Sequence, residues 1–227
     1  IGEAESWRDY WKYWWEAPAG GKRGNPDFLL APDPDGWKNN YPVAYWDDRW
    51  KNIIIYGENS LLKQIVDDGF DGIYLDWVEA FLNTDVIAAA KAAKRDPAFE
   101  MTKFLGEMRA YARKRNPKFV LIQQNASELG NQRPDSLGVI DAIAQEQIWF
   151  DGKADTAWAD PTACDLVVPA TGAQYSQAHY LGMLEHYKKN NVPIFNCEYA
   201  CGANAQKVYG DSAGQGFIPY VSRRPLD

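Results

Sequence analysis

Histidine is scarce in this chain of 227 residues, which contains only His179 and His186. Two histidines cannot build a histidine-rich metal cage, and no H-E-x-x-H zinc helix is present. Both lie in the stretch HYLGMLEHYKK, where apolar residues recur at helical spacing, so we expect an ordinary amphipathic helix there. The sequence also lacks a Walker A loop and a dinucleotide-binding glycine turn, which excludes the best-known nucleotide sites.

Cysteine is sparse as well. The chain has three cysteines, an odd number, and none of them form a C-x-x-C pair; they are Cys164, Cys197 and Cys201. Cys197 and Cys201 could close a small loop, Cys164 could pair with either of them, or all three thiols could be reduced. No run of about 20 apolar residues is present, so no membrane insertion is expected of these residues. The chain does not begin with methionine, and we expect that sequence precedes Ile1.

Basic residues are fewer than acidic ones. The chain has 24 Lys and Arg and 31 Asp and Glu, which gives a net charge of −7. This balance argues against nucleic acid or an anionic membrane as the main partner. Aromatic residues, in contrast, make up 14% of the chain and include ten tryptophans. A surplus of aromatic rings often lines a groove for weakly polar ligands such as sugars.

Short apolar runs alternate with helical patterns along the whole chain, which is typical of β/α units around a parallel sheet. Helices are expected at residues 6–16, 85–95 and 97–115. Strands are expected at residues 1–3, 42–47, 69–76, 119–123, 140–145, 192–196 and 216–221. These seven strands predict an α/β fold of the (β/α)₈ TIM-barrel type, with the first β/α unit missing from the N-terminus and residues 1–227 forming one domain. A doubly wound open sheet fits the same alternation, but its usual glycine turn is absent.

Acidic residues follow most of the expected strands. In a (β/α) barrel the active site lies at the carboxyl ends of the strands, so these positions point to function. An acid after a strand is also a common helix cap, and each position alone carries little weight. Converging carboxylates repel one another, however, and their retention as a group favours a functional site. The residues at the expected strand ends are, in order, Glu3, Glu5, Asp47, Asp48, Asp76, Glu79, Asn125, Glu146, Glu198, Ser222 and Arg223.

Asp76 and Glu146 are the strongest catalytic candidates. Asp76 follows the apolar run Ile73-Tyr74-Leu75, and Glu146 lies among apolar residues that favour a protonated acid. Glycoside hydrolysis requires such a pair, in which one carboxylate attacks or stabilises the oxocarbenium-like carbon and the other protonates the leaving oxygen.

Several segments together resemble glycoside hydrolase family 114, which is typified by endo-α-1,4-polygalactosaminidases. The segments are, in order, IGEAE, VAYWDDRW, GFDGIYLDWVEAF, QQNASEL, IDAIAQEQIWF and GFIPYVSRRPLD. The resemblance implies a (β/α)₈ fold, a secreted or cell-envelope location and cleavage of α-1,4-linked galactosamine polymers. It also places the family's paired catalytic acids on Asp76 and Glu146.

The remaining strand-end residues are expected to bind the substrate. Galactosamine units carry ammonium groups that an acidic cleft attracts, so Asp47 and Glu198 are candidates to pair with them. Arg49 is expected to orient a carboxylate, and Asn125 to hydrogen-bond a sugar hydroxyl. The full predicted substrate-binding set is Glu3, Asp47, Arg49, Trp77, Asn125, Trp149, Glu198 and Tyr199, with the aromatic members either stacking on sugar faces or packing in the barrel wall.

Two other functions remain open from the sequence. A non-catalytic carbohydrate-binding barrel would keep an aromatic groove without a competent acid pair. A metal-assisted hydrolase would use Asp47, Asp76 and Glu198 as oxygen ligands for Mg²⁺ or Ca²⁺. The favoured hypothesis needs neither metal nor cofactor, and its partner is a cationic amino-sugar polysaccharide bound by a monomer.

Overall fold

The computed structural model describes residues 1–11 and 26–225, which form two compact units. The first unit contains Ile1–Ile122 and Gly138–Ile140, and the second contains Gln123–Leu137 and Asp141–Asp227. Residues 12–16 of the helix predicted at 6–16 lie outside the described residues, and residues 6–9 form turns rather than helix. The assignment of the whole chain to one domain stays a prediction.

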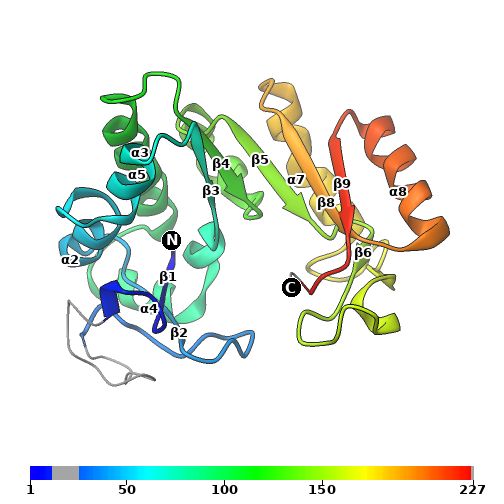
Figure 1. Ribbon diagram of the computed structural model, residues 1–227, viewed down its shortest axis with the longest axis horizontal. Coiled ribbons are helices and arrows are strands. Elements are labelled where there is room, and N and C mark those ends of the chain that lie inside the picture. The colour runs from blue at the N-terminus through cyan, green and yellow to red at the C-terminus, as the bar shows by residue number, and fades with distance from the viewer. Residues whose placement is uncertain (12–25, 226–227) are drawn as a thin grey trace. The chain divides into compact units, whose positions relative to one another are not determined.

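A five-stranded sheet has the order β3-β4-β5-β8-β9, and strand β4 belongs in part to each unit (Figure 1). The pairs β5–β8 and β8–β9 are parallel. The strands are β3 (Gly72–Leu75), β4 (Val120–Gln124), β5 (Ala142–Glu146), β8 (Ile194–Tyr199) and β9 (Ile218–Ser222). All five overlap segments that the apolar runs predict as strands, and helices separate most of them, so the predicted α/β class is confirmed.

The first unit begins differently from the prediction. Strand β1 (Glu3–Glu5) pairs antiparallel with β2 (Asn40–Pro42) in a separate two-stranded sheet. The expected strand at 42–47 is therefore wrong beyond Pro42, where only an isolated antiparallel bridge joins Val43 to Leu29. The reason is local, because the backbone N–H of Asp47 bonds to the carbonyl of Ala44 and turns the chain into a helix.

The rest of the first unit is helical and packs around helix α5 (Pro97–Arg113). Asp96 caps α5 by accepting from the Phe99 N–H at 3.1 Å, and Pro97 occupies the first turn, where its missing N–H costs no helical bond. The buried face of α5 carries Phe104, Leu105 and Met108 at helical spacing. The elements are α2 (Asp48–Lys51), a π-helical turn (Asn52–Tyr56), α3 (Leu61–Asp67), a 3₁₀ turn (Val78–Leu82), α4 (Thr84–Ala92) and α5 (Pro97–Arg113).

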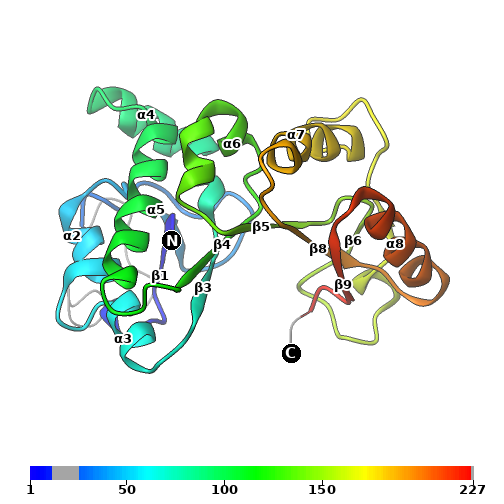
Figure 2. The ribbon, with the colours of Figure 1, turned by 90° about the horizontal axis from the view of Figure 1, so that it is seen from above.

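In the second unit, α8 packs along β8 and β9, and α7 packs on β8 and α6 (Figure 2). Gly216 ends α8 in the left-handed conformation with a φ of 78°, which a glycine adopts without steric cost. The elements are α6 (Glu128–Gln132), a 3₁₀ turn (Pro134–Gly138), β6 (Phe150–Asp151), a 3₁₀ turn (Pro161–Ala163), β7 (Leu166–Val167), α7 (Gln177–Lys189) and α8 (Gly202–Gln215). Strands β6 and β7 form an antiparallel pair.

Gly130 allows α6 to approach α7 closely. A Cβ at this position would lie 2.7 Å from the ring of Tyr187, which is fully buried on α7. The Tyr187 hydroxyl accepts a hydrogen bond from the Gly130 N–H at 3.0 Å and thereby satisfies a buried donor. This contact fixes the short helix that follows the carboxyl end of β4.

A disulfide joins Cys164 to Cys201 across 37 residues, and Cys197 is free. Of the arrangements that the sequence left open, the structure therefore selects a pairing of Cys164. The bond ties the segment after β6 to the start of α8. Cys201 also donates its backbone N–H to Asp165 at 2.9 Å, so the two segments are held at two adjacent points.

Removing this disulfide is expected to destabilise the protein by about 2–4 kcal/mol, because the cross-link restricts the unfolded chain. The double variant Cys164→Ser with Cys201→Ser tests this by urea unfolding. Cys197→Ser is the matched control, since it removes a thiol without opening a loop. Equal unfolding midpoints for the wild type and the double variant would contradict the prediction.

Within residues 1–11 and 26–225, no helix combines the length and the hydrophobicity that a membrane span requires.

Candidate active site

Glu146 ends strand β5, and both of its carboxylate oxygens are held by neighbouring side chains. Gln124, the last residue of β4, donates its Nε2 to Oε1 at 3.0 Å. Tyr199, the last residue of β8, donates its hydroxyl to Oε2 at 3.2 Å. Donors from the two flanking strands therefore fix the rotamer of a half-buried carboxylate. A preoriented carboxyl group at a strand end is what acid/base chemistry needs.

Asn125 supports Glu146 through the backbone. Its Oδ1 accepts from the N–H of Glu146 at 2.9 Å and from Nε2 of Gln145 at 3.1 Å. Asn125, Ala126 and Gln147 all have positive φ angles, of 48°, 56° and 48°. Non-glycine residues in this conformation are strained and tend to occur at functional sites. Asn125 thus lies beside Glu146 and holds the end of β5, and its predicted hydrogen bond to a sugar hydroxyl stays a prediction.

Tyr199 remains a donor because burial raises the pKa of its phenol, and the negative charge of Glu146 raises it further. The guanidinium of Arg224 lies 5.5 Å from the centre of the Tyr199 ring, and its Nη1 is 2.5 Å from Oδ1 of Asp151. Arg224 therefore covers one face of the ring, and Asp151 holds the guanidinium in place. The Tyr199 hydroxyl donates to Glu146.

Cys197 is opposite Glu146 in the β5–β8 register. Burial raises the pKa of its thiol to about 12, and the nearby carboxylates of Glu146 and Glu198 add to the shift. The thiol is consequently protonated near neutrality, and a protonated thiol is a poor nucleophile. Cysteine catalysis is thus unfavourable at this position.

Glu198 is fully buried, and both of its carboxylate oxygens accept hydrogen bonds from neighbouring residues of the chain. Oε1 accepts from the Ile148 N–H at 2.6 Å and Asn196 Nδ2 at 2.8 Å, while Oε2 accepts from the N–H groups of Trp149 and Phe150 at 2.9 and 2.7 Å. Burial raises the pKa of this carboxyl, and the four donors oppose the shift. Glu198 therefore shapes the segment after Glu146, and we do not retain it among the proposed contacts to substrate amines.

The aromatic residues predicted to stack on sugars are mostly enclosed. Trp77, Trp149 and Tyr199 are only 8%, 8% and 5% exposed. Their ring faces pack against protein, which corresponds to the barrel-wall alternative that the sequence left open. Any aromatic platform in the described part of the chain must come from other residues.

Asp76 follows β3 in the first unit and is exposed rather than shielded from water as its apolar strand predicted. It lines a cavity of about 410 Å³ together with Glu3 and Glu5. Tyr10, Trp50 and Tyr74 contribute aromatic surface to the same cavity. This unit therefore presents an aromatic-lined concavity that includes Asp76, and Glu5 within it is paired with Arg8.

Glu3 is 8% exposed and its Oε1 accepts from Nδ2 of Asn40 at 2.8 Å. Burial raises the pKa of its carboxyl to about 8, although the Asn40 bond opposes the shift. A carboxyl group in this state is largely neutral at pH 7. Its use as an anionic contact for an ammonium group is correspondingly weakened.

Asp47 caps α2, and its carboxylate is held by Arg49. Arg49 donates Nε to Oδ1 at 2.9 Å and Nη2 to Oδ2 at 2.7 Å, and its Nη2 also reaches Asp27 at 2.6 Å. Hydrogen bonds from Arg49 lower the pKa of Asp47. The carboxylate is ionised but already neutralised, so a substrate amine would have to compete with a bidentate guanidinium.

Among the described residues, one group of His, Cys, Asp and Glu side chains is close enough together to hold a metal ion, namely Cys164, Asp165 and Cys201. Its two sulfurs form the disulfide and cannot serve as thiolate ligands. Glu198, a ligand in the metal hypothesis, has no acceptor position left. The donor set proposed from the sequence is therefore a poor fit to a cation.

The pentapeptide GDSAG at residues 210–214 matches the G-x-S-x-G pattern of serine hydrolases. It lies inside helix α8 rather than at a strand-to-helix turn. Ser212 is fully buried and donates to Oδ1 of Asn196 at 2.6 Å. The pattern is therefore not a nucleophile turn. Ser212 packs inside the fold and is not an exposed nucleophile.

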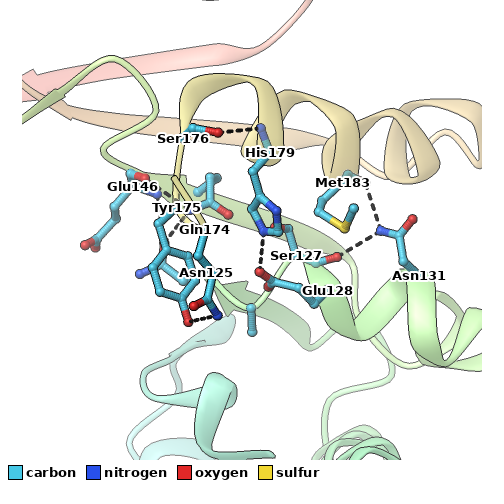
Figure 3. A network of polar contacts seen from close by, with 12 residues as sticks. Asn125, Ser127, Glu128, Asn131, Glu146, Gln174, Tyr175, Ser176, His179 and Met183 are labelled. Atoms are coloured by element: carbon cyan, nitrogen blue, oxygen red, sulfur yellow. Dashed lines mark hydrogen bonds and ion pairs between the residues drawn. The ribbon is translucent and has the colours of Figure 1, made fainter. Parts of the chain in front are cut away.

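Sequence reasoning missed a polar network beside Asn125 (Figure 3). His179 of α7 lies 2.6 Å from Oε1 of Glu128, the first residue of α6. Asn131 Nδ2 donates to the carbonyls of Ser127 and Met183 at 3.1 and 3.0 Å. These bonds join α6 to α7. Only the placement of Glu128 just after the strand-end Asn125 could have indicated the pairing.

The chain matches a known family over its whole length: residues 1–227 fit the sequence model of glycoside-hydrolase family GH114. An uncharacterized protein of Deinococcus radiodurans is 32% identical over 228 residues, which cover 100% of this chain and 63% of that protein. An uncharacterized protein of Thermotoga maritima is 36% identical over 132 residues, 57% of this chain and 36% of its own. The chain thus spans less than two thirds of the length of these relatives.

Two solved structures share the fold. Aspergillus fumigatus Ega3, in complex with galactosamine, has a TM-score of 0.64 at 18% identity over 100% of this chain and 73% of that chain. The glycoside hydrolase domain of PelA from Pseudomonas aeruginosa has the same TM-score and identity over 100% of this chain and 76% of its own. At this identity the likeness establishes the fold.

Proposed function

The chain belongs to glycoside-hydrolase family GH114, and on this basis we propose that it is an endo-acting hydrolase of α-1,4-linked, galactosamine-containing polysaccharide. The observation that carries the proposal is the carboxylate of Glu146, held at a strand end by Gln124 and Tyr199. A family of glycosidases and a preoriented carboxyl group together support a two-carboxylate mechanism.

In this mechanism Glu146 is the general acid/base, and it protonates the glycosidic oxygen as the bond breaks. Asp76 is the nucleophile or the carboxylate that stabilises the oxocarbenium-like carbon. Exposure of Asp76 beside a cavity of about 410 Å³ is compatible with access of a sugar ring. Carboxyl groups separated by about 5–5.5 Å lead to retention of configuration and those separated by about 6.5–9.5 Å to inversion.

The charge of the chain supports the proposed substrate class. The chain carries a net charge of −7, and Asp76 lines the cavity of the first unit, where Glu5 is paired with Arg8. Deacetylated galactosamine carries an ammonium group at neutral pH, so an acidic protein attracts its polymer. A galactosamine complex of the structurally similar Ega3 supports the same sugar. We extend the proposal to a monomer that needs no cofactor and acts outside the cytoplasm, where the Cys164–Cys201 disulfide would persist.

Partially deacetylated α-1,4-galactosaminogalactan is expected to be cut into oligosaccharides, which a reducing-end assay and mass spectrometry detect. Chitosan is the matched control, because it has the same amine charge on a β-linked glucosamine backbone. Hydrolysis should slow as the salt concentration rises, since salt screens the attraction between polymer and protein. Binding without new reducing ends would refute hydrolysis and favour a carbohydrate-binding role, and equal cleavage of chitosan would refute the specificity.

A further inference from the structure

Tyr175 is far more exposed than the residues predicted to stack on sugars. It is 49% exposed, whereas Trp149 and Tyr199 beside Glu146 are 8% and 5% exposed. It lies in the second unit on the segment that leads into α7, after the small-residue stretch ATGA at residues 170–173. An exposed ring is a candidate ligand contact only if its orientation is fixed and its place relates to the site.

The orientation of the ring is fixed from three sides. The ring of His179 meets it edge-on, with centroids 6.1 Å apart and an interplanar angle of 90°. Tyr180 stacks on it at 6.3 Å and 19°, and Gln174 donates Nε2 to its hydroxyl at 3.3 Å. Such contacts hold an aromatic ring in one orientation and reduce the entropy lost when a ligand stacks on it.

Two series of contacts within the second unit connect the Tyr175 ring to Glu146. On one side, Val168 donates its N–H to the Trp149 carbonyl at 3.0 Å, and Gln177 Nε2 donates to the Val168 carbonyl at 2.7 Å. Trp149 lies three residues after Glu146. The segment bearing Tyr175 is thereby anchored to the loop that leaves the catalytic strand.

On the other side, His179 pairs with Glu128 at 2.6 Å. Glu128 lies three residues after Asn125, whose Oδ1 binds the Glu146 N–H. Figure 3 shows His179 between Tyr175 and Glu128, with Asn125 and Glu146 in the same network. The Glu128–His179 pair thus connects the ring to the residue that holds the catalytic strand end.

We propose that Tyr175 is the stacking platform of a sugar-binding subsite next to Glu146, and that the Glu128–His179 pair is a positioning pair for its ring. The inference rests on the proposed function, because the ligand is a sugar unit of the same amino-sugar polymer. The apolar face of a pyranose ring packs on an aromatic face, and nearby polar groups bind its hydroxyls. Gln174 supplies such a group.

The variant Tyr175→Ala is expected to raise KM for the galactosamine polymer about tenfold with kcat within twofold, because a platform away from the reacting bond contributes uniform binding. Tyr175→Phe keeps the ring and should remain within about threefold of the wild-type KM. Tyr209→Ala is the matched control, since Tyr209 is 43% exposed on α8 of the same unit. Circular dichroism confirms that each variant is folded.

A double-mutant cycle tests the positioning pair. His179→Ala should raise KM in the wild-type protein but add little in the Tyr175→Ala background, because it acts through the ring. Independent, additive effects on KM would overturn the role of the pair. An unchanged KM for Tyr175→Ala on a polymer that the wild type cuts would overturn the platform and leave the proposed hydrolysis intact.

Affinity electrophoresis decides the case in which the wild type cuts nothing, because it needs no catalysis. Gels containing the galactosamine polymer or chitosan should retard the wild type and Tyr209→Ala more than Tyr175→Ala. Identical mobility of the wild type and Tyr175→Ala in both gels would overturn the platform. Absence of hydrolysis in the solution assay would separately refute the proposed function.

Discussion

Replacing Glu146 with glutamine is expected to lower kcat by about 10²–10⁴-fold, the usual contribution of general acid/base catalysis. Glutamine has nearly the same shape but cannot donate an acidic proton to the leaving oxygen. Its carbonyl can still accept from Tyr199 or Gln124, so the fold at the end of β5 should be retained. The measurement is the initial rate on the galactosamine polymer at saturating concentration.

The matched control is Glu185→Gln, which changes an exposed glutamate of α7 paired with Lys188 at 2.9 Å. Exposed pairs of this kind contribute little, and the control should retain wild-type kcat. A Glu146→Gln variant that keeps more than a tenth of the wild-type kcat would remove Glu146 from the role of general acid. Asp76→Asn is expected to be impaired to a similar or greater degree, with Asp71→Asn as its exposed control.

The central strands could be predicted from sequence because each is a short apolar run with turn residues around it. The run Ile73-Tyr74-Leu75 between Gly72 and Asp76 is the clearest example, and it forms β3. The run after Pro42 resembles it, yet a local turn ends the extended chain. The Val43 N–H still bonds to the Gly2 carbonyl at 3.0 Å, but the Asp47 N–H bonds back to the Ala44 carbonyl at 2.8 Å.

The site was harder to predict. A sequence shows which residues end a strand, but not which hydrogen bonds their side chains already make within the protein. Glu146 and Glu198 look alike as acids after apolar runs. One meets two side-chain donors at a half-buried position, and the other is enclosed by four N–H groups. Tyr175 was missed for the opposite reason, because it follows a loop without periodicity and gains its orientation from His179 on the next helix.

Glu198→Ala is expected to lower the free energy of unfolding by about 4 kcal/mol or more. The substitution leaves four buried donors without an acceptor, and each unsatisfied group costs about 1–3 kcal/mol. Three of these donors are consecutive backbone N–H groups, from Ile148 to Phe150, at 2.6–2.9 Å from the carboxylate oxygens. A loss of this size is a large fraction of the roughly 5–15 kcal/mol that stabilises a domain.

The isosteric variant Glu198→Gln distinguishes hydrogen bonding from lost volume. Its carbonyl oxygen can accept from two donors, but its NH₂ group must face the other two, so we expect a loss of about half that of Glu198→Ala. Urea unfolding of both variants measures the difference, with Glu185→Ala as the exposed control. Because the three N–H groups begin two residues after Glu146, both variants should also weaken catalysis in proportion to the disorder of that loop. A Glu198→Gln variant as stable and as active as the wild type would instead show that the enclosed carboxylate serves neither the fold nor the site.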